Sequence, residues 1–196
     1  MHTFETIAMQ DNSKYLKIWK PFIDRMAALM LFVLLLPVMV SIAVLLKING
    51  SSIIFKHSRP GINEQLFELY KFTSMKNGEI TKIGSLLRKS SLDEIPQLVN
   101  IIKGEMSFVG PRPLLKEYLE TYSNTARKRH QVKPGVTGLA QVNGRNAITL
   151  DEKVKLDIAY VQNVSFVLDL KILLKTAVRI FYFHQADYHS LELRKH

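Results

Sequence analysis

The chain has 196 residues, 47% of them apolar, and it carries 27 lysines and arginines against 17 aspartates and glutamates. This length predicts one domain with a sizeable core, and the positive charge favours a polyanionic partner such as a phosphorylated substrate, an anionic membrane or nucleic acid. The absence of cysteine excludes disulfides, thiolate catalysis and cysteine-ligated zinc, and it allows a reducing cytosolic location.

The first predicted element is an apolar helix that follows a polar N-terminal arm at residues 1–19. Residues 26–46 contain no charged side chain, and as a helix they match the thickness of a bilayer's hydrocarbon core, about 30 Å. The run is too long and begins too far along the chain for a cleaved signal peptide. We therefore predict a membrane-embedded helix over residues 20–48, which favours a membrane over nucleic acid as the partner.

The topology of this helix depends on its flanks and on Pro37. Basic residues lie on both sides of the apolar run, so the positive-inside rule places both ends in the cytoplasm. Pro37 lies near the middle and provides a break at which the helix can turn back. We predict a re-entrant helix, whose freed backbone groups would need partners within the membrane. A single-pass anchor is the alternative.

Two short strands are expected next, within residues 51–75, on either side of a Pro-Gly turn. Residues 114–130 have apolar residues at helical spacing and basic residues at the C-terminal end, which predicts an amphipathic helix. His130 closes this segment. We interpret it as a partner of the helix dipole rather than as a catalytic base.

The C-terminal third contains a glycine-rich segment and two predicted helices. Residues 134–146 suit a tight loop or hairpin that brings backbone close to a ligand, although they match neither the Walker A loop nor the Rossmann fingerprint. One helix is predicted from Leu150 to about Gln162, and another over residues 168–183. The basic residues of the last helix recur every fourth position, at Lys171, Lys175 and Arg179. This helix can lie in the membrane interface, or it can pack on the core with one solvated basic face. Residues 185–196 form a tail.

Residues 88–113 carry two adjacent carboxylates, Asp93 and Glu94, among basic side chains. The pattern Ser91-x-x-Glu94 before an apolar run fits a capping box, in which both acids would have only a structural role. A functional interpretation starts from the same position, because a helix N-terminus keeps a carboxylate ionised and attracts phosphate. An ionised aspartate is a possible nucleophile. Pro96 would crowd a regular first turn, so we expect an irregular or kinked one.

Arg112 lies between Pro111 and Pro113, which restrict the backbone on either side. A guanidinium held in this way could bind a phosphate through two hydrogen bonds. The alternative is an ordinary arginine in a surface loop.

Several ordered motifs together resemble one family. They are KxxxDR before an apolar helix with a central proline, RPG, LRKSSLDEIPQL, KGEMSFVGPRPLL, KPGVTG and AQVNGRN. From about Lys20 to Ala177 the chain resembles the bacterial monotopic phosphoglycosyl transferases, which start the assembly of glycans linked to polyprenyl phosphate. The resemblance implies a mainly helical α+β fold at the inner membrane. A re-entrant helix would precede a small cytosolic catalytic domain, residues 49–184, with short strands or a hairpin and interfacial amphipathic helices.

The implied activity is transfer of a sugar 1-phosphate from a UDP-sugar to undecaprenyl phosphate, with release of UMP, on the cytoplasmic side of the membrane. Such a reaction starts O-antigen, capsule, exopolysaccharide or glycoprotein glycan assembly, so downstream glycosyltransferases are expected partners. In the family, the aspartate of a DE pair attacks the sugar-proximal phosphate to form a covalent intermediate, and the glutamate helps to hold Mg²⁺. These positions match Asp93 and Glu94, which are expected to hold the metal together. The sugar itself is left open.

The resemblance also suggests substrate contacts. The expected contacts to nucleotide or phosphate are Arg59, Arg88, Arg112 and Arg145. Asp157 is expected to orient one of these arginines. Gln141 and Asn143 would either read a polar edge of the substrate or satisfy the backbone of their own loop.

Two departures from the family pattern affect these expectations. A leucine precedes Pro37 where the family usually has serine, so a hydroxyl that could satisfy the broken helix is missing. Thr73 replaces the arginine of a KFRxM motif, and the missing basic contact is either lost or supplied by Lys76 or Lys82.

The alternative function is that of a non-catalytic basic scaffold anchored in the membrane. Such a scaffold has no need of an ionised acid pair beside fixed arginines, so Asp93 and Glu94 favour the enzyme. No nucleic acid partner is predicted, because the sequence has neither a recognised motif nor a basic-aromatic stacking platform.

Overall fold

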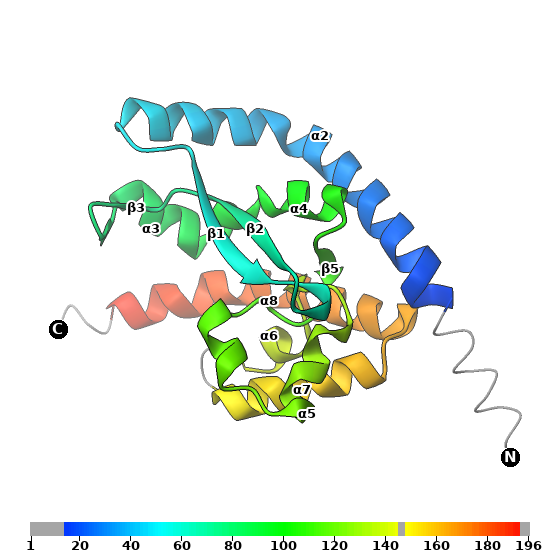
Figure 1. Cartoon of the computed structure of the whole chain (residues 1–196). Coiled ribbons are helices and arrows are strands. Elements are labelled where there is room, and N and C mark those ends of the chain that lie inside the picture. Colours follow the sequence, from blue (N-terminus) through cyan, green and yellow to red (C-terminus); the bar gives the residue numbers. More distant parts are fainter. Residues whose placement is uncertain (1–13, 145–147, 193–196) are drawn as a thin grey trace, which may run out of the picture.

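The computed structural model describes residues 14–144 and 148–192, and it describes the side chains of the last helix as far as Arg179. The described chain is mainly helical with short strands, which confirms the predicted fold class (Figure 1). Its strands pair into three sheets of two strands each within the described residues.

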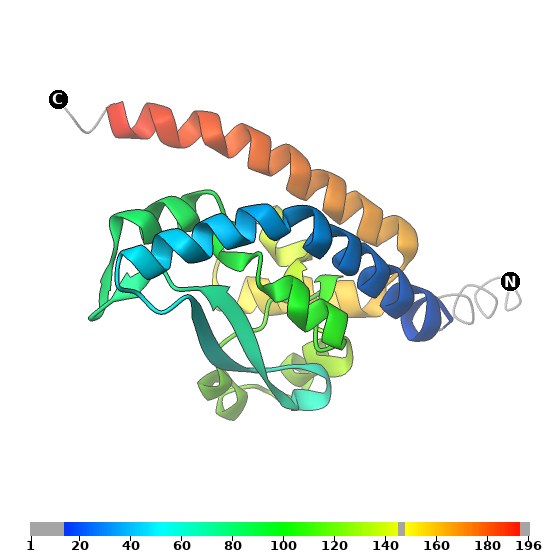
Figure 2. The same ribbon diagram turned by 90° about the horizontal axis from the view of Figure 1, so that it is seen from above.

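Helix α2 (Lys20–Ile48) continues directly from a π-helical segment, η1 (Tyr15–Trp19). By length and composition this combined helix could cross a membrane, and most of its apolar residues are exposed. Figures 1 and 2 show α2 bent along its length and lying over one face of the body. Ala28, Ile42 and Leu46 are buried against that body, so both halves of the helix contact the same domain.

The predicted pair of strands after the membrane helix is confirmed. Strands β1 (Ile54–Pro60) and β2 (Leu66–Phe72) are antiparallel, with Ile54 opposite Phe72 and Pro60 opposite Leu66. The short helical turn η2 (Ile62–Glu64) lies between them.

A second hairpin was not anticipated. It joins β3 (Met75–Lys76) to β4 (Glu79–Ile80) through Asn77 and Gly78, both of which have positive φ. An Asn-Gly pair is the preferred sequence of such a two-residue turn. The local signal for this hairpin was therefore present in the sequence.

The prediction of one amphipathic helix over residues 114–130 is wrong. The segment forms three short pieces, η4 (Lys116–Glu120), α5 (Asn124–Arg127) and η5 (Lys128–Gln131). The Ser123 hydroxyl accepts a hydrogen bond from the backbone N–H of Ala126. Serine in this role begins a new helix and interrupts the preceding one.

His130 is buried, and burial together with the neighbouring Arg129 lowers its pKa to about 4. Its imidazole is therefore neutral near pH 7. A neutral ring has no charge with which to complement a helix C-terminus, so our interpretation of His130 as a dipole partner is wrong.

The glycine-rich segment is not a hairpin. It forms β6 (Gly135–Thr137), parallel to β5 (Ser107–Val109), and then α6 (Leu139–Asn143). A Cβ atom at Gly135 would lie 2.1 Å from the backbone nitrogen of Gly110, and one at Gly138 would lie 2.2 Å from its carbonyl oxygen. These glycines thus permit close contact between two backbone segments, and residues between and after them line a cavity, among them Thr137 and Gln141.

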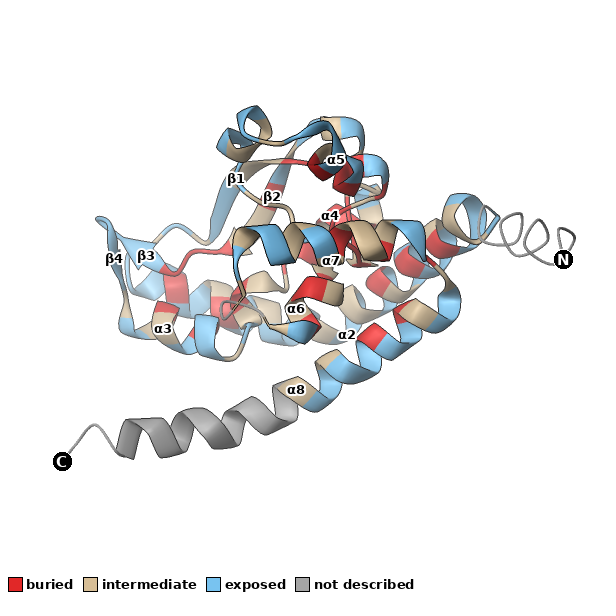
Figure 3. Cartoon of the chain, turned by 90° about the horizontal axis from the view of Figure 1, so that it is seen from below, coloured by how far each residue is buried: buried red, intermediate tan, exposed pale blue. Residues whose placement is uncertain are grey.

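Helix α7 (Leu150–Gln162) has the predicted bounds, and Thr149 and Glu152 form a capping box at its start. Helix α8 (Phe166–Glu192) contains the predicted last helix. Tyr160 and Ile172, from these two helices, pack with Val109 in a buried cluster. Exposed residues predominate along the described part of α8 (Figure 3), and they include Lys171 and Lys175. Arg179 instead donates to the backbone oxygen of Gln141, so the predicted basic stripe does not form one solvated face.

Candidate active site

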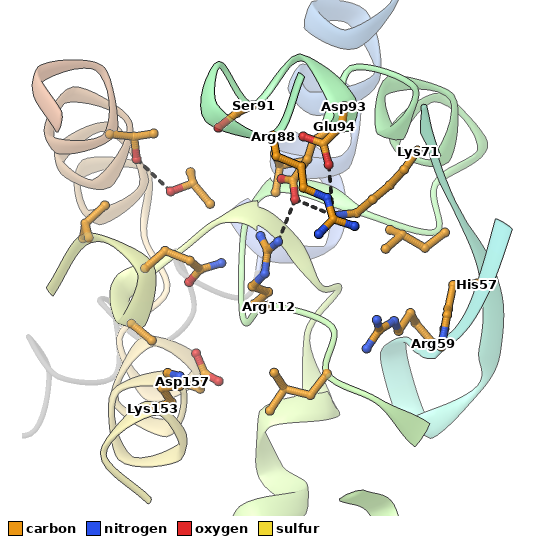
Figure 4. A pocket seen from close by; sticks show the side chains of 18 of the residues that line it. His57, Arg59, Lys71, Arg88, Ser91, Asp93, Glu94, Arg112, Lys153 and Asp157 are labelled. Carbon is orange, nitrogen blue, oxygen red and sulfur yellow. Dashed lines mark hydrogen bonds and ion pairs between the residues drawn. The ribbon is translucent and has the colours of Figure 1, made fainter. Parts of the chain in front are cut away.

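A cavity of about 760 Å³ lies beside the β1–β2 hairpin and reaches the acidic turn, α6, α7 and α8 (Figure 4). Basic side chains outnumber acidic ones in its wall. Its basic and acidic lining residues are His57, Arg59, Lys71, Arg88, Asp93, Glu94, Arg112, Arg129, Lys153, Asp157 and Arg179. A concave site with this charge suits an anionic ligand.

The acidic turn is irregular, as Pro96 predicted. Residues Leu92–Glu94 form a single 3₁₀ turn, η3, and helix α4 (Gln97–Lys103) begins only after Pro96. Ser91 has a left-handed backbone, with a φ of 57°, and its side chain caps nothing. The predicted capping box at Ser91 is therefore wrong. Because the acids lie on a separate turn ahead of the helix, both carboxylates can face the cavity.

Glu94 is tightly held by two cations. Its Oε1 atom accepts hydrogen bonds from Lys71 Nζ and Arg112 Nη2, each at 2.6 Å. Burial alone would raise the pKa of this carboxyl, but the charges of Arg112 and Lys71 outweigh burial and lower it to about 2. Glu94 is therefore ionised throughout the physiological range.

Asp93 has a different environment, although it is the next residue. No described residue donates a hydrogen bond to its side chain, and its nearest cation, Lys71 Nζ, lies 3.9 Å from Oδ2. Burial raises the pKa of Asp93, an effect that Lys71 offsets in part and Glu94 reinforces. The result is a poorly solvated carboxylate that borders a cavity, which is the setting expected of a nucleophile.

Asp157 pairs with none of the three predicted arginines that the structure describes, Arg59, Arg88 and Arg112. Its Oδ2 atom instead accepts hydrogen bonds from Arg129, from Nη2 at 2.6 Å and Nε at 3.1 Å. Both side chains are almost fully buried. Arg129 also donates to the backbone oxygen of Arg112 at 2.8 Å, so this ion pair supports the loop that presents Arg112 to Glu94.

Arg59 and Arg88 both line the cavity, as predicted. The Nε atom of Arg59 is buried without a hydrogen-bond partner. Arg88 Nε donates to the Ser74 hydroxyl at 2.8 Å. Neither arginine has a carboxylate of a described residue within ion-pair distance, so both are available to a substrate phosphate.

Gln141 and Asn143 have separate roles. Gln141 lines the cavity, and both polar atoms of its side chain are buried without a partner, which fits a contact to a polar ligand edge. Asn143 is exposed and donates to the backbone oxygen of Leu139, so it satisfies its own helix end. Arg145 lies outside the described residues.

Two important side chains were missed as site residues, Lys71 and Arg129. Lys71 belongs to the altered KFRxM motif, and the replacement of its arginine by Thr73 does not indicate a role for the lysine. Neither suggested replacement lines the cavity, and Lys76 donates to the backbone oxygen of Asn49. Strand alternation could have indicated Lys71, but no local signal pairs Arg129 with a residue 28 positions away.

The two carboxylates of the acid pair could supply part of the ligand shell of the expected Mg²⁺. Mg²⁺ prefers oxygen ligands and commonly combines one or two carboxylates with water and substrate phosphates. The described residues contain no group of three or more His, Asp or Glu side chains that could enclose a metal by themselves. Asp93 and Glu94 would therefore hold a metal ion that shares its shell with a phosphorylated substrate.

Comparisons with known proteins identify the family of this chain. A model of the family described as bacterial sugar transferase matches residues 15–182. An uncharacterized sugar transferase of Bacillus subtilis, EpsL, is 47% identical over 155 residues, which covers 73% of this chain and 77% of that protein. The exopolysaccharide production protein ExoY of Sinorhizobium fredii is 39% identical over 183 residues, which covers 78% of this chain and 81% of that protein.

A longer relative carries a more specific name. The UDP-glucose:undecaprenyl-phosphate glucose-1-phosphate transferase of Xanthomonas campestris is 35% identical over 194 residues, which covers 87% of this chain but 40% of that protein. The match thus extends over most of this chain. The chain belongs to the bacterial sugar transferase family, and it is an enzyme of the phosphoglycosyl transferase class.

Proposed function

We propose that the enzyme transfers a sugar 1-phosphate from a UDP-sugar to undecaprenyl phosphate, releasing UMP, through a covalent intermediate on Asp93. The observation that carries this proposal is the asymmetry of the acid pair. Glu94 is bound by two cations, whereas Asp93 accepts no hydrogen bond from a described residue and borders a basic cavity. The names of relatives from Xanthomonas campestris and Salmonella typhimurium, which specify undecaprenyl phosphate, support the same substrates.

The reaction would occur in two steps. In the first, an oxygen of Asp93 attacks the sugar-proximal phosphorus, and the bond from that phosphorus to the oxygen of UMP breaks, so UMP leaves with the electron pair. In the second, a phosphate oxygen of the lipid attacks the same phosphorus and the Asp93 carboxylate leaves. Lys71 and Arg112 would stabilise charge on the transferring group. Mg²⁺, when bound at Asp93 and Glu94, would supply further charge neutralisation.

The covalent route has a direct test. Mixed with a UDP-sugar and Mg²⁺ but without lipid acceptor, the wild-type enzyme should release at most one UMP per protein and retain a phosphosugar on the Asp93 peptide, visible by mass spectrometry. Turnover that requires both substrates at once, with no adduct, would contradict it. A folded enzyme that is inert towards every UDP-sugar, even with undecaprenyl phosphate, would instead favour the non-catalytic scaffold.

We also propose that α2 is re-entrant, with both of its ends and the catalytic domain on the cytoplasmic side of the inner membrane. A straight helix of 29 residues is about 44 Å long and would place its ends on opposite sides of a bilayer. Yet Lys20, at one end, pairs with Asp169 of α8, and Leu46, near the other end, packs with Phe72 and Leu87. Contact of both ends with one domain supports the re-entrant arrangement.

This topology can be tested with single cysteines in a chain that has none of its own. Ser13→Cys and Ser51→Cys should both be protected from a membrane-impermeant reagent in intact cells and react after lysis. Periplasmic labelling of position 13 alone would identify a single-pass anchor. Replacing Pro37 by alanine should favour a straighter helix and produce some spanning molecules, because it restores a backbone donor and removes a steric clash within α2.

We further propose that the product starts a surface or secreted glycan that downstream glycosyltransferases extend. The match to an exopolysaccharide production protein supports exopolysaccharide as this glycan. A screen of UMP release across UDP-sugars, among them UDP-glucose, UDP-galactose and UDP-linked N-acetylated sugars, would identify the donor.

A further inference from the structure

Helix α3 (Lys82–Lys89) rests directly on the backbone at the end of strand β2, and this contact positions Arg88. We propose that Ser74 is a positioning residue for Arg88, and that Gly84 allows the close approach which brings the two together. The inference rests on the proposed function, because it assigns the terminal nitrogens of Arg88 to a substrate phosphate.

The close approach occurs at Gly84, in the first turn of α3. A Cβ atom added there would lie 1.9 Å from the carbonyl oxygen of Ser74 and 2.6 Å from its Cα. Any side chain at position 84 would therefore push the helix away from the strand. The same carbonyl accepts a hydrogen bond from the backbone N–H of Thr81, the residue that caps α3.

Arg88 follows Gly84 by four residues, so the two lie on the same face of the helix. From this face Arg88 Nε donates a hydrogen bond of 2.8 Å to the hydroxyl of Ser74, which is 8% exposed. This hydroxyl is buried just after the end of β2, so its position as an acceptor is well fixed. It fixes the plane of the guanidinium while using only one of its five N–H groups.

The remaining nitrogens of Arg88 face the same cavity as Asp93 (Figure 4). Lys71, Arg112 and Arg129 are each paired with a carboxylate, but no carboxylate of a described residue lies within ion-pair distance of Arg88. A planar guanidinium with two free terminal nitrogens matches the geometry of a phosphate. The terminal nitrogens of Arg88 are therefore positioned to bind a substrate phosphate rather than a carboxylate of the protein.

Ser74 also lies three residues after Lys71, just beyond the end of strand β2. This short segment thus supplies the lysine that contacts Glu94 and the hydroxyl that holds Arg88. A displacement of the segment would move both cations relative to the acidic turn. This arrangement gives Ser74 a function although it would not touch the substrate.

A double-mutant cycle tests the proposal, with UMP release from the UDP-sugar as its readout. Ser74→Ala should lower kcat/KM about tenfold, because the freed guanidinium loses a charge-assisted hydrogen bond. Arg88→Met should lower it further. In the Arg88→Met background, Ser74→Ala should change kcat/KM less than about twofold, since the partner of the hydroxyl is gone.

Thr73→Val is the matched control. It removes a neighbouring hydroxyl that is also 8% exposed, but that hydroxyl pairs with Ser52 at 3.0 Å and does not line the cavity. This variant should retain wild-type kcat/KM. Equal losses from Ser74→Ala in both backgrounds would show that Ser74 supports the fold, and no loss in the wild-type background would show that its hydroxyl is not needed. Either result overturns the proposal.

The role of Gly84 has its own variant, Gly84→Ala. It should lower kcat/KM to the level of Arg88→Met or below and abolish the coupling between positions 74 and 88. Wild-type kcat/KM with the coupling intact would refute this part. If Gly84→Ala does not fold, the cycle at positions 74 and 88 still decides the role of Ser74.

Failure of the proposed function would look different. If the wild type released no UMP from any UDP-sugar, calorimetry with inorganic pyrophosphate on the same four proteins of the cycle would still measure the coupling at Arg88. Pyrophosphate affinity should then fall with Ser74→Ala only where Arg88 is present. An equal fall in both backgrounds, or none, would count against Ser74 as a positioning residue.

Discussion

Two buried aspartates with a lysine nearby, Asp93 and Asp169, have opposite environments. Asp169 accepts hydrogen bonds at 2.5 Å from Lys20 Nζ, and at 2.7 Å from the hydroxyls of Tyr15 and Tyr160. Asp93 accepts none from a described residue, and Lys71 is 3.9 Å away. Both residues are less than 10% exposed. Burial therefore does not distinguish Asp169 from the proposed nucleophile Asp93, whereas unused hydrogen-bonding capacity beside a cavity does.

The two environments have different consequences for stability. Asp169 joins η1, the start of α2, α7 and α8, so its ion pair with Lys20 holds the membrane helix to the catalytic domain. The raised pKa of Asp93 means that folding disfavours its ionised form. Such a cost is tolerated where a reactive group is required.

The largest expected effect is that of Asp93→Asn. It removes the proposed nucleophile, so turnover should fall by roughly a thousandfold or more. Because the folded-state pKa of Asp93 lies above its unfolded value, the neutral amide should leave the melting temperature unchanged or slightly higher near pH 7. Measured rates of UMP release and thermal melts would check both parts. Full turnover by this variant would remove Asp93 from the mechanism.

Asp169→Asn should show the reverse pattern. It leaves Lys20 buried without its closest partner, which should lower the free energy of unfolding by about 3 kcal/mol. The variant does not touch the cavity, so kcat per folded molecule should stay close to that of the wild type. Denaturant unfolding and active-site titration would measure the two quantities. A stable but inactive Asp169→Asn variant would show that Asp169 is needed for catalysis rather than for stability.

The smallest expected effect is a shift in the pH profile of Lys71→Met. The proposed mechanism requires ionised Asp93, so activity should be lost as pH falls through the raised pKa of that group, while Glu94, with a pKa of about 2, remains ionised. Lys71 lowers the pKa of Asp93, so its removal should raise that pKa and move the acid limb of kcat to higher pH. The maximum rate should fall as well, but only the position of the acidic side of the pH–rate profile reports the pKa of Asp93.

Lys56→Met is the control for this shift. Lys56 is an exposed lysine on the neighbouring strand, it pairs with Glu68, and it does not line the cavity. Its removal changes the net charge of the protein equally and should leave the acid limb in place. An unchanged limb in Lys71→Met, or an equal shift in both variants, would show that Lys71 does not set the ionisation of Asp93.

Features with a local physical cause could be predicted from the sequence. Helix α7 has its predicted bounds because periodicity and a capping box at Thr149 specify the same segment. The charge-free run specifies α2, and Pro96 specifies an irregular acidic turn. Local rules also failed where two explanations competed. The capping-box pattern at Ser91 was satisfied in sequence, but the left-handed backbone at that residue rules it out.

Only the tertiary structure decided which charges meet. Lys71 reaches Glu94 across 23 positions, Arg129 reaches Asp157 across 28, and Lys20 reaches Asp169 across 149. An ion pair forms where packing brings two elements together, and sequence periodicity describes one element at a time. The motifs thus determined that Asp93 and Glu94 lie on one turn among basic residues. The packing of β2, α3 and the loop that carries Arg112 around that turn determined that Glu94 is ion-paired with two cations, whereas Asp93 accepts no hydrogen bond from a described residue.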